Sequence, residues 1–222
     1  MTTFVELNHV LDNGMPVYPG IPVPEPKFEA ALDHAESRER YGGKAEFYLG
    51  KVEMGGNTGT YIDSPFHRYP DGADLSGVPL ESVAGLPGIV IGAAPSDGRE
   101  IGPDALTQGE SDLSGRAVLI RTGWDARWGS DSYWDPGPYL NSAMADVLVE
   151  SGATLVGVDF WNIDDTDDPA RPVHTRLLGS DIPIVEHMAN LGALPESGFR
   201  FYAVPLRIVR GASFPVRAFA EV

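Results

Sequence analysis

The pattern of apolar residues along the chain predicts several short, buried strands. Four mostly apolar runs are separated by turn-forming residues, and they cover residues 88–92, 117–121, 154–158 and 201–206. Continuous apolar runs of this length are typical of strands buried on both faces of a sheet. The 26 glycines and 19 prolines are spread along the chain without forming a linker, which indicates many short elements joined by tight turns.

Helical spacing of apolar residues is clearest over residues 142–151. Asn141 is placed to cap the start of this helix, and Gly152 is placed to end it. A second helix is predicted to begin near Pro172 and to carry His174, since proline is favoured in the first turn.

Weaker helical signals occur at residues 84–85 and 103–106. The balance of strands over helices predicts an α/β fold, with one domain covering residues 1–222 and a mixed, barrel-like β-sheet with few helices.

Composition narrows the classes of function. A chain of 222 residues with 42% hydrophobic residues can bury one sizeable core. The formal charge of −16 argues against a nucleic-acid partner, which would require clustered lysine and arginine. No run approaches the roughly 18 apolar residues of a membrane span, and the first residues do not resemble a secretion signal, so we expect a cytoplasmic protein with no membrane partner. The absence of cysteine excludes disulfides, thiolate ligands and a cysteine nucleophile.

One stretch is the most informative about function: Asn57-Thr58-Gly59-Thr60-Tyr61-Ile62-Asp63-Ser64-Pro65-Phe66-His67. It resembles the motif His-x-Gly-Thr-His-x-Asp-x-Pro-x-His of the kynurenine formamidase-like cyclase family of metal hydrolases. Asn57 and Tyr61 stand where the motif has two metal-binding histidines, and neither amide nor neutral phenol is a strong metal ligand.

The resemblance continues along the chain. Residues 155–159 resemble the end of a family strand, and the segments 174–178 and 182–186 resemble those that supply a late His and Glu to the metal centre, here His174 and Glu186. Weaker matches occur at residues 17–20, 118–124 and 213–218. The resemblance therefore implies the family fold over nearly the whole chain.

Asp63 and His67 are the first candidates for chemistry. Ser64 precedes a proline and is expected to be extended, so Pro65 is predicted to open a short helix that presents His67. Asp63 then has two readings, a cap for that helix or, as the resemblance implies, the carboxylate of the metal centre. The resemblance implies that His67 is the base or ligand nearest the attacking water, and imidazole suits proton transfer near neutral pH.

Tyr61 and Asn57 also have two readings. They could fill the space of two missing imidazoles, or Tyr61 could donate a hydrogen bond or proton to a substrate carbonyl while Asn57 orients the substrate. The predicted catalytic set is therefore His67, Asp63, Tyr61, His174 and Glu186. If an ion is retained, Asp63, His67, His174 and Glu186 could hold at most one divalent ion, zinc or manganese, and without an ion they would share protons as a coupled unit.

Further residues are expected to line or flank the pocket. Asn57, Tyr18, Phe66, Trp124 and Trp161 are predicted to bind the substrate, as polar or aromatic residues near the motif segments. His9, His34 and His187 are expected to be structural or on the surface, although His9 could reach the pocket. The acidic run at residues 164–168 lacks the glycine and final glutamate of a calcium loop and is expected to be a solvated turn.

Three functions remain open at this point. The first is hydrolysis of an amide, lactam or lactone of a small cyclic or aromatic substrate. The second is a metal-independent cyclase or dehydratase of natural-product biosynthesis that uses Tyr61 and His67. The third is a catalytically silent binding protein on the same scaffold. The resemblance also implies a homodimer or homotetramer.

Overall fold

The computed structural model describes the chain except residues 1, 21, 94–97 and 107–111. Its strands and α-helices follow in the order β1 (Phe4–Glu6), β2 (Lys27–Leu32), α1 (His34–Arg40), β3 (Leu49–Glu53), β4 (Tyr61–Asp63), β5 (Ala84–Gly92), β6 (Glu100–Ile101), β7 (Ala117–Arg121), β8 (Tyr139–Leu140), α2 (Ser142–Glu150), β9 (Leu155–Val158), α3 (Pro172–Leu178), β10 (Ile184–Glu186), β11 (Ser197–Tyr202), β12 (Ser213–Pro215) and β13 (Phe219–Glu221). Among these described elements no helix is long and apolar enough to cross a membrane.

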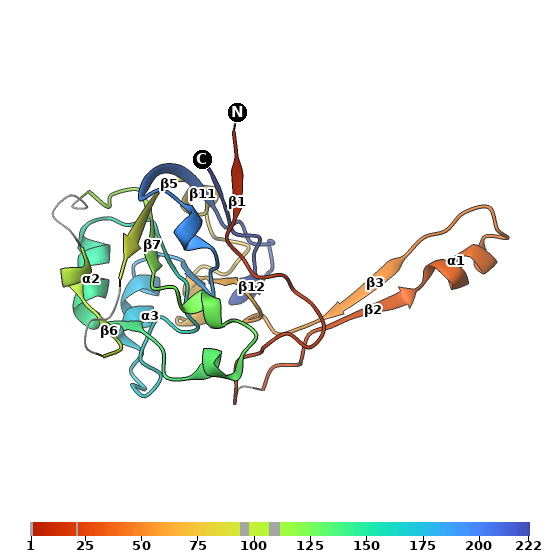
Figure 1. The fold of residues 1–222 in the computed structure, drawn as a ribbon, viewed down its shortest axis with the longest axis horizontal. Coiled ribbons are helices and arrows are strands. Elements are labelled where there is room, and N and C mark those ends of the chain that lie inside the picture. The colour runs from red at the N-terminus through yellow and green to blue at the C-terminus, as the bar shows by residue number, and fades with distance from the viewer. Residues whose placement is uncertain (1, 21, 94–97, 107–111) are drawn as a thin grey trace.

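A nine-stranded mixed sheet forms the body, in the order β1-β13-β11-β5-β7-β9-β10-β4-β12. The central strands β5, β7, β9 and β10 run parallel to one another, and the outer pairs are antiparallel. The sheet curls into a half-barrel, so the prediction of a single α/β domain with a mixed, barrel-like sheet is confirmed (Figure 1).

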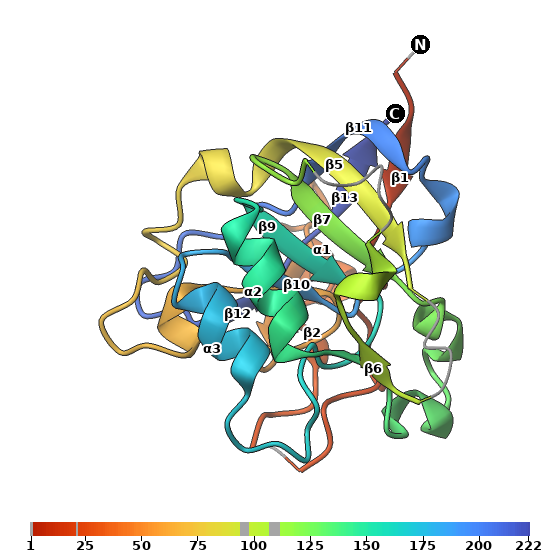
Figure 2. The ribbon, with the colours of Figure 1, turned by 90° about the vertical axis from the view of Figure 1, so that its left-hand side faces the viewer.

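Two apolar clusters lie on the two faces of this sheet. Helices α2 and α3 cover one face, where Ile120, Val156 and Leu177 belong to one cluster (Figure 2). Leu119, Leu155 and Phe201 belong to the second cluster. Alternate residues of β7 and β9 thus enter different clusters, which is why these strands have continuous apolar sequences.

The predicted elements of the body are mostly confirmed. The strands at 117–121 and 154–158 correspond to β7 and β9, and the helices predicted at 142–151 and near Pro172 correspond to α2 and α3. Asn141 caps α2 as expected, because its Oδ1 accepts a hydrogen bond from the backbone N–H of Met144 (2.8 Å). Residues 103–105 form a single 3₁₀ turn.

Two boundaries were predicted wrongly. Residues 84–85 are strand and not helix, because β5 extends back to Ala84, which pairs with Tyr202 across a β-bulge. The strand predicted at 201–206 instead begins at Ser197 and ends at Tyr202. Pro205 has no N–H to donate to a ladder, and Val204 and Leu206 are exposed, so the apolar run does not continue the strand.

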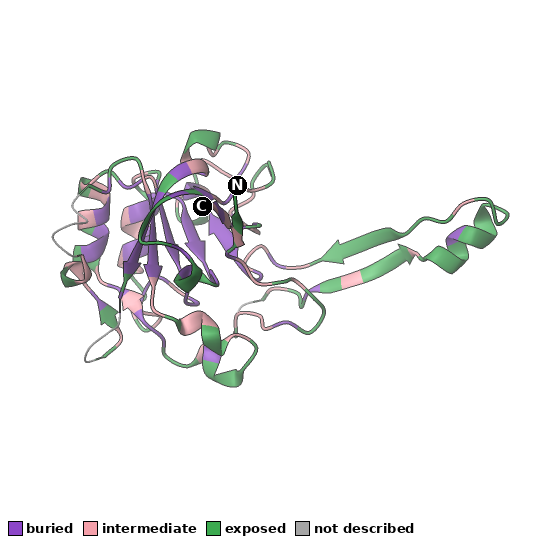
Figure 3. Cartoon of the chain, turned by 45° about the horizontal axis from the view of Figure 1, so that its top comes forward, coloured by how far each residue is buried: buried purple, intermediate pink, exposed green. Residues whose placement is uncertain are grey.

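A long hairpin arm, residues 27–53, was not predicted from the sequence. Strands β2 and β3 pair antiparallel from Lys27↔Glu53 outward, and α1 lies at the tip, where Asp33 forms a capping box with Glu36. The arm extends away from the body, and almost all of its residues are exposed (Figure 3).

Candidate active site

The register of three strands brings the motif residues together. Strand β4 lies between β10 and β12, with Tyr61 opposite Glu186 and Asp63 opposite Ser213. Paired residues and residues two apart share one face of a sheet, so these four side chains project to the same side. The motif's Gly59 precedes β4 with φ +61°, a conformation that favours glycine, and a Cβ there would lie 2.4 Å from the side chain of Leu11, which would have to shift.

Asp63 is buried, and its two oxygens have different surroundings. The Ser213 hydroxyl donates a hydrogen bond to Oδ1. Oδ2 has no hydrogen-bond partner among the described residues and lies 3.8 Å from Nε2 of His174. The capping reading of Asp63 is wrong, because Ser64 is the N-cap of the following turn and no side chain caps it.

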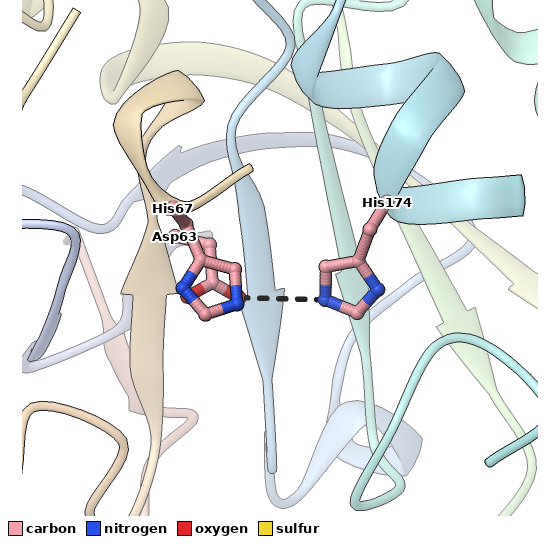
Figure 4. Close-up of side chains that lie close together, drawn as sticks. All are labelled: Asp63, His67 and His174. Atoms are coloured by element: carbon pink, nitrogen blue, oxygen red, sulfur yellow. Dashed lines mark ion pairs between the residues drawn. The ribbon is translucent and has the colours of Figure 1, made fainter. Parts of the chain in front are cut away.

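His67 lies on the short helix that the sequence predicted. Pro65–His67 form one 3₁₀ turn that begins at the proline. Nδ1 of His67 lies 3.2 Å from the Ser213 hydroxyl and 3.8 Å from Oδ1 of Asp63. The ring is partly exposed and faces His174 across a gap, with ring centroids 5.8 Å apart (Figure 4).

His174 is held in place by Asp164, a residue that sequence reasoning missed. Asp164 accepts hydrogen bonds from the backbone N–H groups of Val173 (2.7 Å) and His174 (3.0 Å) at the start of α3, and its Oδ2 lies 2.6 Å from Nδ1 of His174. This contact directs Nε2 of His174 toward Asp63 and Glu186, each 3.8 Å away. The run 164–168 was expected to be a solvated turn, but Asp164 is buried and contacts the His174 ring.

Glu186, at the end of β10, is fully engaged. Its Oε2 accepts a hydrogen bond from the Tyr61 hydroxyl, and its Oε1 accepts one from the backbone N–H of Ile163 (2.6 Å). Tyr61 therefore donates a hydrogen bond to a carboxylate, which is a more specific role than filling space.

The four titratable groups have unequal proton affinities. Burial lowers the pKa of His174, but hydrogen bonds to Asp164 and Asp63 and the charge of Glu186 outweigh it and raise that pKa to about 10. Burial raises the pKa of Glu186 to about 7, opposed by the charge of His174. Burial also acts to raise the pKa of Asp63, but the neighbouring His67 and His174 more than offset it, and the pKa is lowered. Burial raises the pKa of Tyr61 well above its usual value, so this phenol stays protonated at neutral pH.

Asp63, His67 and His174 together fit a single divalent ion. One ligand atom from each of Asp63, His67 and His174 lies within 4.8 Å of the other two. The unpartnered Oδ2 of Asp63 and the Asp164-oriented imidazole of His174 are the features expected of metal ligands. Glu186 was predicted as a fourth ligand, but it lies beside this set with both oxygens accepting other hydrogen bonds.

A pocket of about 310 Å³ opens over these groups. Six of the predicted site residues line it: Tyr18, Asn57, Tyr61, His67, His174 and Glu186. Arg68, Asn162 and Arg171 also line it and were missed, because single polar residues in loops carry no recognisable sequence signal.

The remaining predicted aromatic residues are placed less directly. Trp161 packs edge-on against Tyr18 (5.3 Å) and so stands behind the pocket wall. Phe66 lies under the guanidinium of Arg210 (5.7 Å), and Trp124 under that of Arg127 (3.9 Å). Neither Phe66 nor Trp124 is among the described residues that line the pocket.

The other histidines are structural or exposed, as predicted. His187 is buried, and its Nδ1 lies 2.7 Å from the Tyr133 hydroxyl. His9 stacks on Trp128 (3.9 Å) and is not among the described lining residues, and His34 is exposed on the arm.

Comparisons with known proteins agree with this fold. A family model described as "Putative cyclase" matches residues 5–165. The chain is 30% identical over 221 residues to a kynurenine formamidase of Geobacillus thermodenitrificans, covering 98% of this chain and 97% of the relative. It is 31% identical over 171 residues to a kynurenine formamidase of Bacillus cytotoxicus, covering 77% and 78%.

A solved structure shares the fold. Isatin hydrolase A from Labrenzia aggregata, bound to benzyl benzoate, superposes with a TM-score of 0.86 at 24% identity, covering 100% of this chain and 94% of the other. Fold, site and relatives together define the class of the protein as a hydrolase built on a curled mixed sheet. The chain belongs to the cyclase family, the family of the kynurenine formamidases.

Proposed function

We propose that this pocket hydrolyses an amide, lactam or lactone bond of a small cyclic or aromatic substrate. The observation that carries the proposal is the convergence of His67, Asp63, His174 and Glu186 at one pocket of about 310 Å³, a volume suited to a single small ring system. The similar proteins are named kynurenine formamidase and isatin hydrolase, and these names support the same reaction class.

His67 is the proposed base for the attacking water. The Ser213 hydroxyl commits its hydrogen to Asp63, so its oxygen is left to accept from Nδ1–H of His67. Nε2 of His67 is then the unprotonated nitrogen, and it is able to take a proton from water in the pocket. Asp63 and Ser213 act as positioning residues that fix this tautomer.

Tyr61 and Glu186 form the proposed acid. Glu186, with a pKa of about 7, carries a proton in part of the molecules at neutral pH. When it does, Glu186 donates to the Tyr61 oxygen, and the phenol hydrogen turns toward the pocket that Tyr61 lines. Tyr61 can then protonate the leaving nitrogen or oxygen while it recovers a proton from Glu186.

Asp63, His67 and His174 are the residues that would hold a divalent ion such as zinc or manganese. Such an ion, when bound, would polarise the substrate carbonyl and lower the pKa of a water molecule. In that state His67 would serve as a metal ligand and not as the base. Activity measured with and without chelator therefore distinguishes the metal-dependent from the metal-free reaction.

A second candidate is ring closure or dehydration without metal. It is favoured by Tyr61 and Asn57, which stand at the positions of two ligands in the family motif. Closure at a carbonyl uses the same base and acid as hydrolysis, so product analysis in both directions distinguishes them.

The test is turnover of N-formylkynurenine, isatin and simple aromatic lactones, with chelator and with added Zn²⁺ or Mn²⁺. We expect hydrolysis of at least one compound by the wild type, and a loss of about 10²–10⁴-fold in His67→Gln. Full activity of His67→Gln would overturn the role of His67. If the enzyme formed a closed ring from the open acid and hydrolysed none of the compounds, the cyclase function would be accepted and the hydrolase function rejected.

A further inference from the structure

Two arginines line the active-site pocket, although the chain as a whole carries a formal charge of −16. Arg68 directly follows His67, and Arg171 directly precedes the helix α3 that carries His174. Both are therefore attached to the elements that position the catalytic imidazoles.

Arg68 keeps part of its guanidinium available. Its Nε donates a hydrogen bond to the Thr175 hydroxyl (3.0 Å), which anchors the side chain against the first turn of α3. Among the described residues, neither terminal nitrogen of Arg68 has a hydrogen-bond acceptor or a carboxylate at ion-pair distance, and the contact of its side chain is the one through Nε. These donors belong to a side chain that borders the pocket.

Arg171 is held by neutral acceptors. Its Nη1 lies 3.3 Å from the backbone oxygen of Asp165 and 3.5 Å from the amide oxygen of Asn162. Within the described part of the chain it forms no ion pair, whereas the nearby Arg99 pairs with the Asp165 carboxylate (2.9 Å). The backbone of Arg171 has φ +48°, a conformation that non-glycine residues retain mainly where the surroundings fix it, often at ligand sites.

The charges around the pocket make these cations significant. Asp63 and Glu186 lie in or beside it, and the field of an acidic chain repels an anionic ligand. A guanidinium with free N–H groups matches the two oxygens of a carboxylate, and such charge-assisted bonds are about twice as strong as neutral ones. Two guanidinium groups lining one pocket would offset the repulsion between the acidic chain and a ligand that carries a carboxylate.

We propose that Arg68 and Arg171 form an anion-binding subsite that selects substrates carrying a carboxylate. Tyr18, beside Arg171 and packed on Trp161 and Trp134 (5.3 and 5.9 Å), supplies an aromatic wall for a ring attached to that carboxylate. The inference rests on the proposed function for the identity of the pocket, and it adds the class of ligand.

The test uses benzoate and benzamide as probes, because they share size and ring and differ in charge. Calorimetric titration of chelator-treated wild type should give benzoate an affinity at least about 10-fold higher than benzamide. Arg68→Gln and Arg171→Gln should each weaken benzoate about 10-fold or more and leave benzamide unchanged. Arg176→Gln is the matched control. Arg176 is on helix α3, which Arg171 precedes; it pairs with Asp146 (2.7 Å) and is not among the described residues that line this pocket.

Arg171→Lys guards against a folding defect, since it keeps the charge but loses the planar fork and should weaken benzoate less than Arg171→Gln does. Equal binding of benzoate and benzamide by the wild type would overturn the subsite, as would full benzoate affinity in both glutamine variants. The assay needs no turnover. Discrimination between the probes without hydrolysis of any test compound would therefore refute the proposed function alone, and hydrolysis without discrimination would refute the subsite alone.

Discussion

Tyr61 and Glu186 face each other across the β4–β10 pair, and the phenol donates a hydrogen bond to the carboxylate. The strand register creates this contact between residues 125 positions apart. In the family motif the position of Tyr61 is a metal-binding histidine, so the substitution exchanges a ligand for a hydrogen-bond donor. The contact links the acid of the proposed mechanism to a carboxylate with a pKa of about 7.

Tyr61→Phe tests this link. The hydrogen bond from Tyr61 lowers the pKa of Glu186, so its removal should raise that pKa above the value of about 7 and move the alkaline limb of the activity profile to higher pH. We expect a rate loss of about 10²-fold, measured as kcat against pH. Tyr133→Phe is the control, because Tyr133 is also buried but contacts His187 outside the pocket. An unchanged rate and profile in Tyr61→Phe would show that the phenol only packs.

The stability of the metal-free protein should fall as pH rises from 7 to 9. His174 has a pKa of about 10 in the folded state and one near the ordinary 6.5 when unfolded, so the folded state binds more protons between these values. Its contribution is complete below about pH 6.5 and is lost as pH rises through about 10. The expected loss between pH 7 and 9 is about 2–3 kcal/mol, measured by urea unfolding.

His174→Gln should remove most of this slope, whereas His34→Gln, at an exposed position on the arm, should keep it. The same slope in His174→Gln as in the wild type would contradict the assignment.

Metal binding should saturate at one ion per chain. Asp63→Asn removes a charged ligand and should weaken Zn²⁺ binding by at least about 10-fold, measured by calorimetry with elemental analysis in parallel. The matched control is Asp146→Asn, because this aspartate is exposed and pairs with Arg176 away from the site. Since three ligands converge among the described residues, fewer than a closed four-ligand site has, chelation should leave the melting temperature almost unchanged. Two ions per chain, or a large fall in melting temperature with chelator, would refute this account of the site.

The arm should mediate self-association. Its exposed apolar side chains include Phe47 and Tyr48 (52% each) and Val52 (57%), and a two-stranded hairpin is only marginally stable by itself in water. We expect the wild type to be a homodimer or homotetramer in light scattering. Replacing residues 28–52 by a short glycine linker between the paired Lys27 and Glu53 should give a monomer.

Serine at positions 47, 48 and 52 together should weaken association while keeping the arm in place. A monomeric wild type would contradict the prediction, as would an oligomer that survives removal of the arm.

The sequence predicted those parts of the fold in which local pattern and tertiary burial agree. Strands β7 and β9 are buried on both faces, so their apolar runs are unambiguous. The arm could not be predicted, because strands β2 and β3 are exposed on both faces and lack a simple alternation of apolar and polar residues.

The site was predictable only where a motif carried it. The resemblance placed Asp63, His67, His174 and Glu186, and the structure brings them together. Ser213 and Arg68 contact residues 150 and 107 positions away. Asp164 and Arg171 contact residues within ten positions, but in irregular loops where no spacing along the chain indicates the contact.

Turnover in H₂¹⁸O tests the central claim most directly. The account predicts that metal-depleted or metal-loaded wild type opens an N-formyl amide or a lactam such as isatin, and that one ¹⁸O atom enters the new carboxylate in the mass spectrum. His67→Gln should form this labelled product at least about 10²-fold more slowly. Product without label, or equal rates of labelling in the wild type and His67→Gln, would contradict hydrolysis by a water molecule activated at this site.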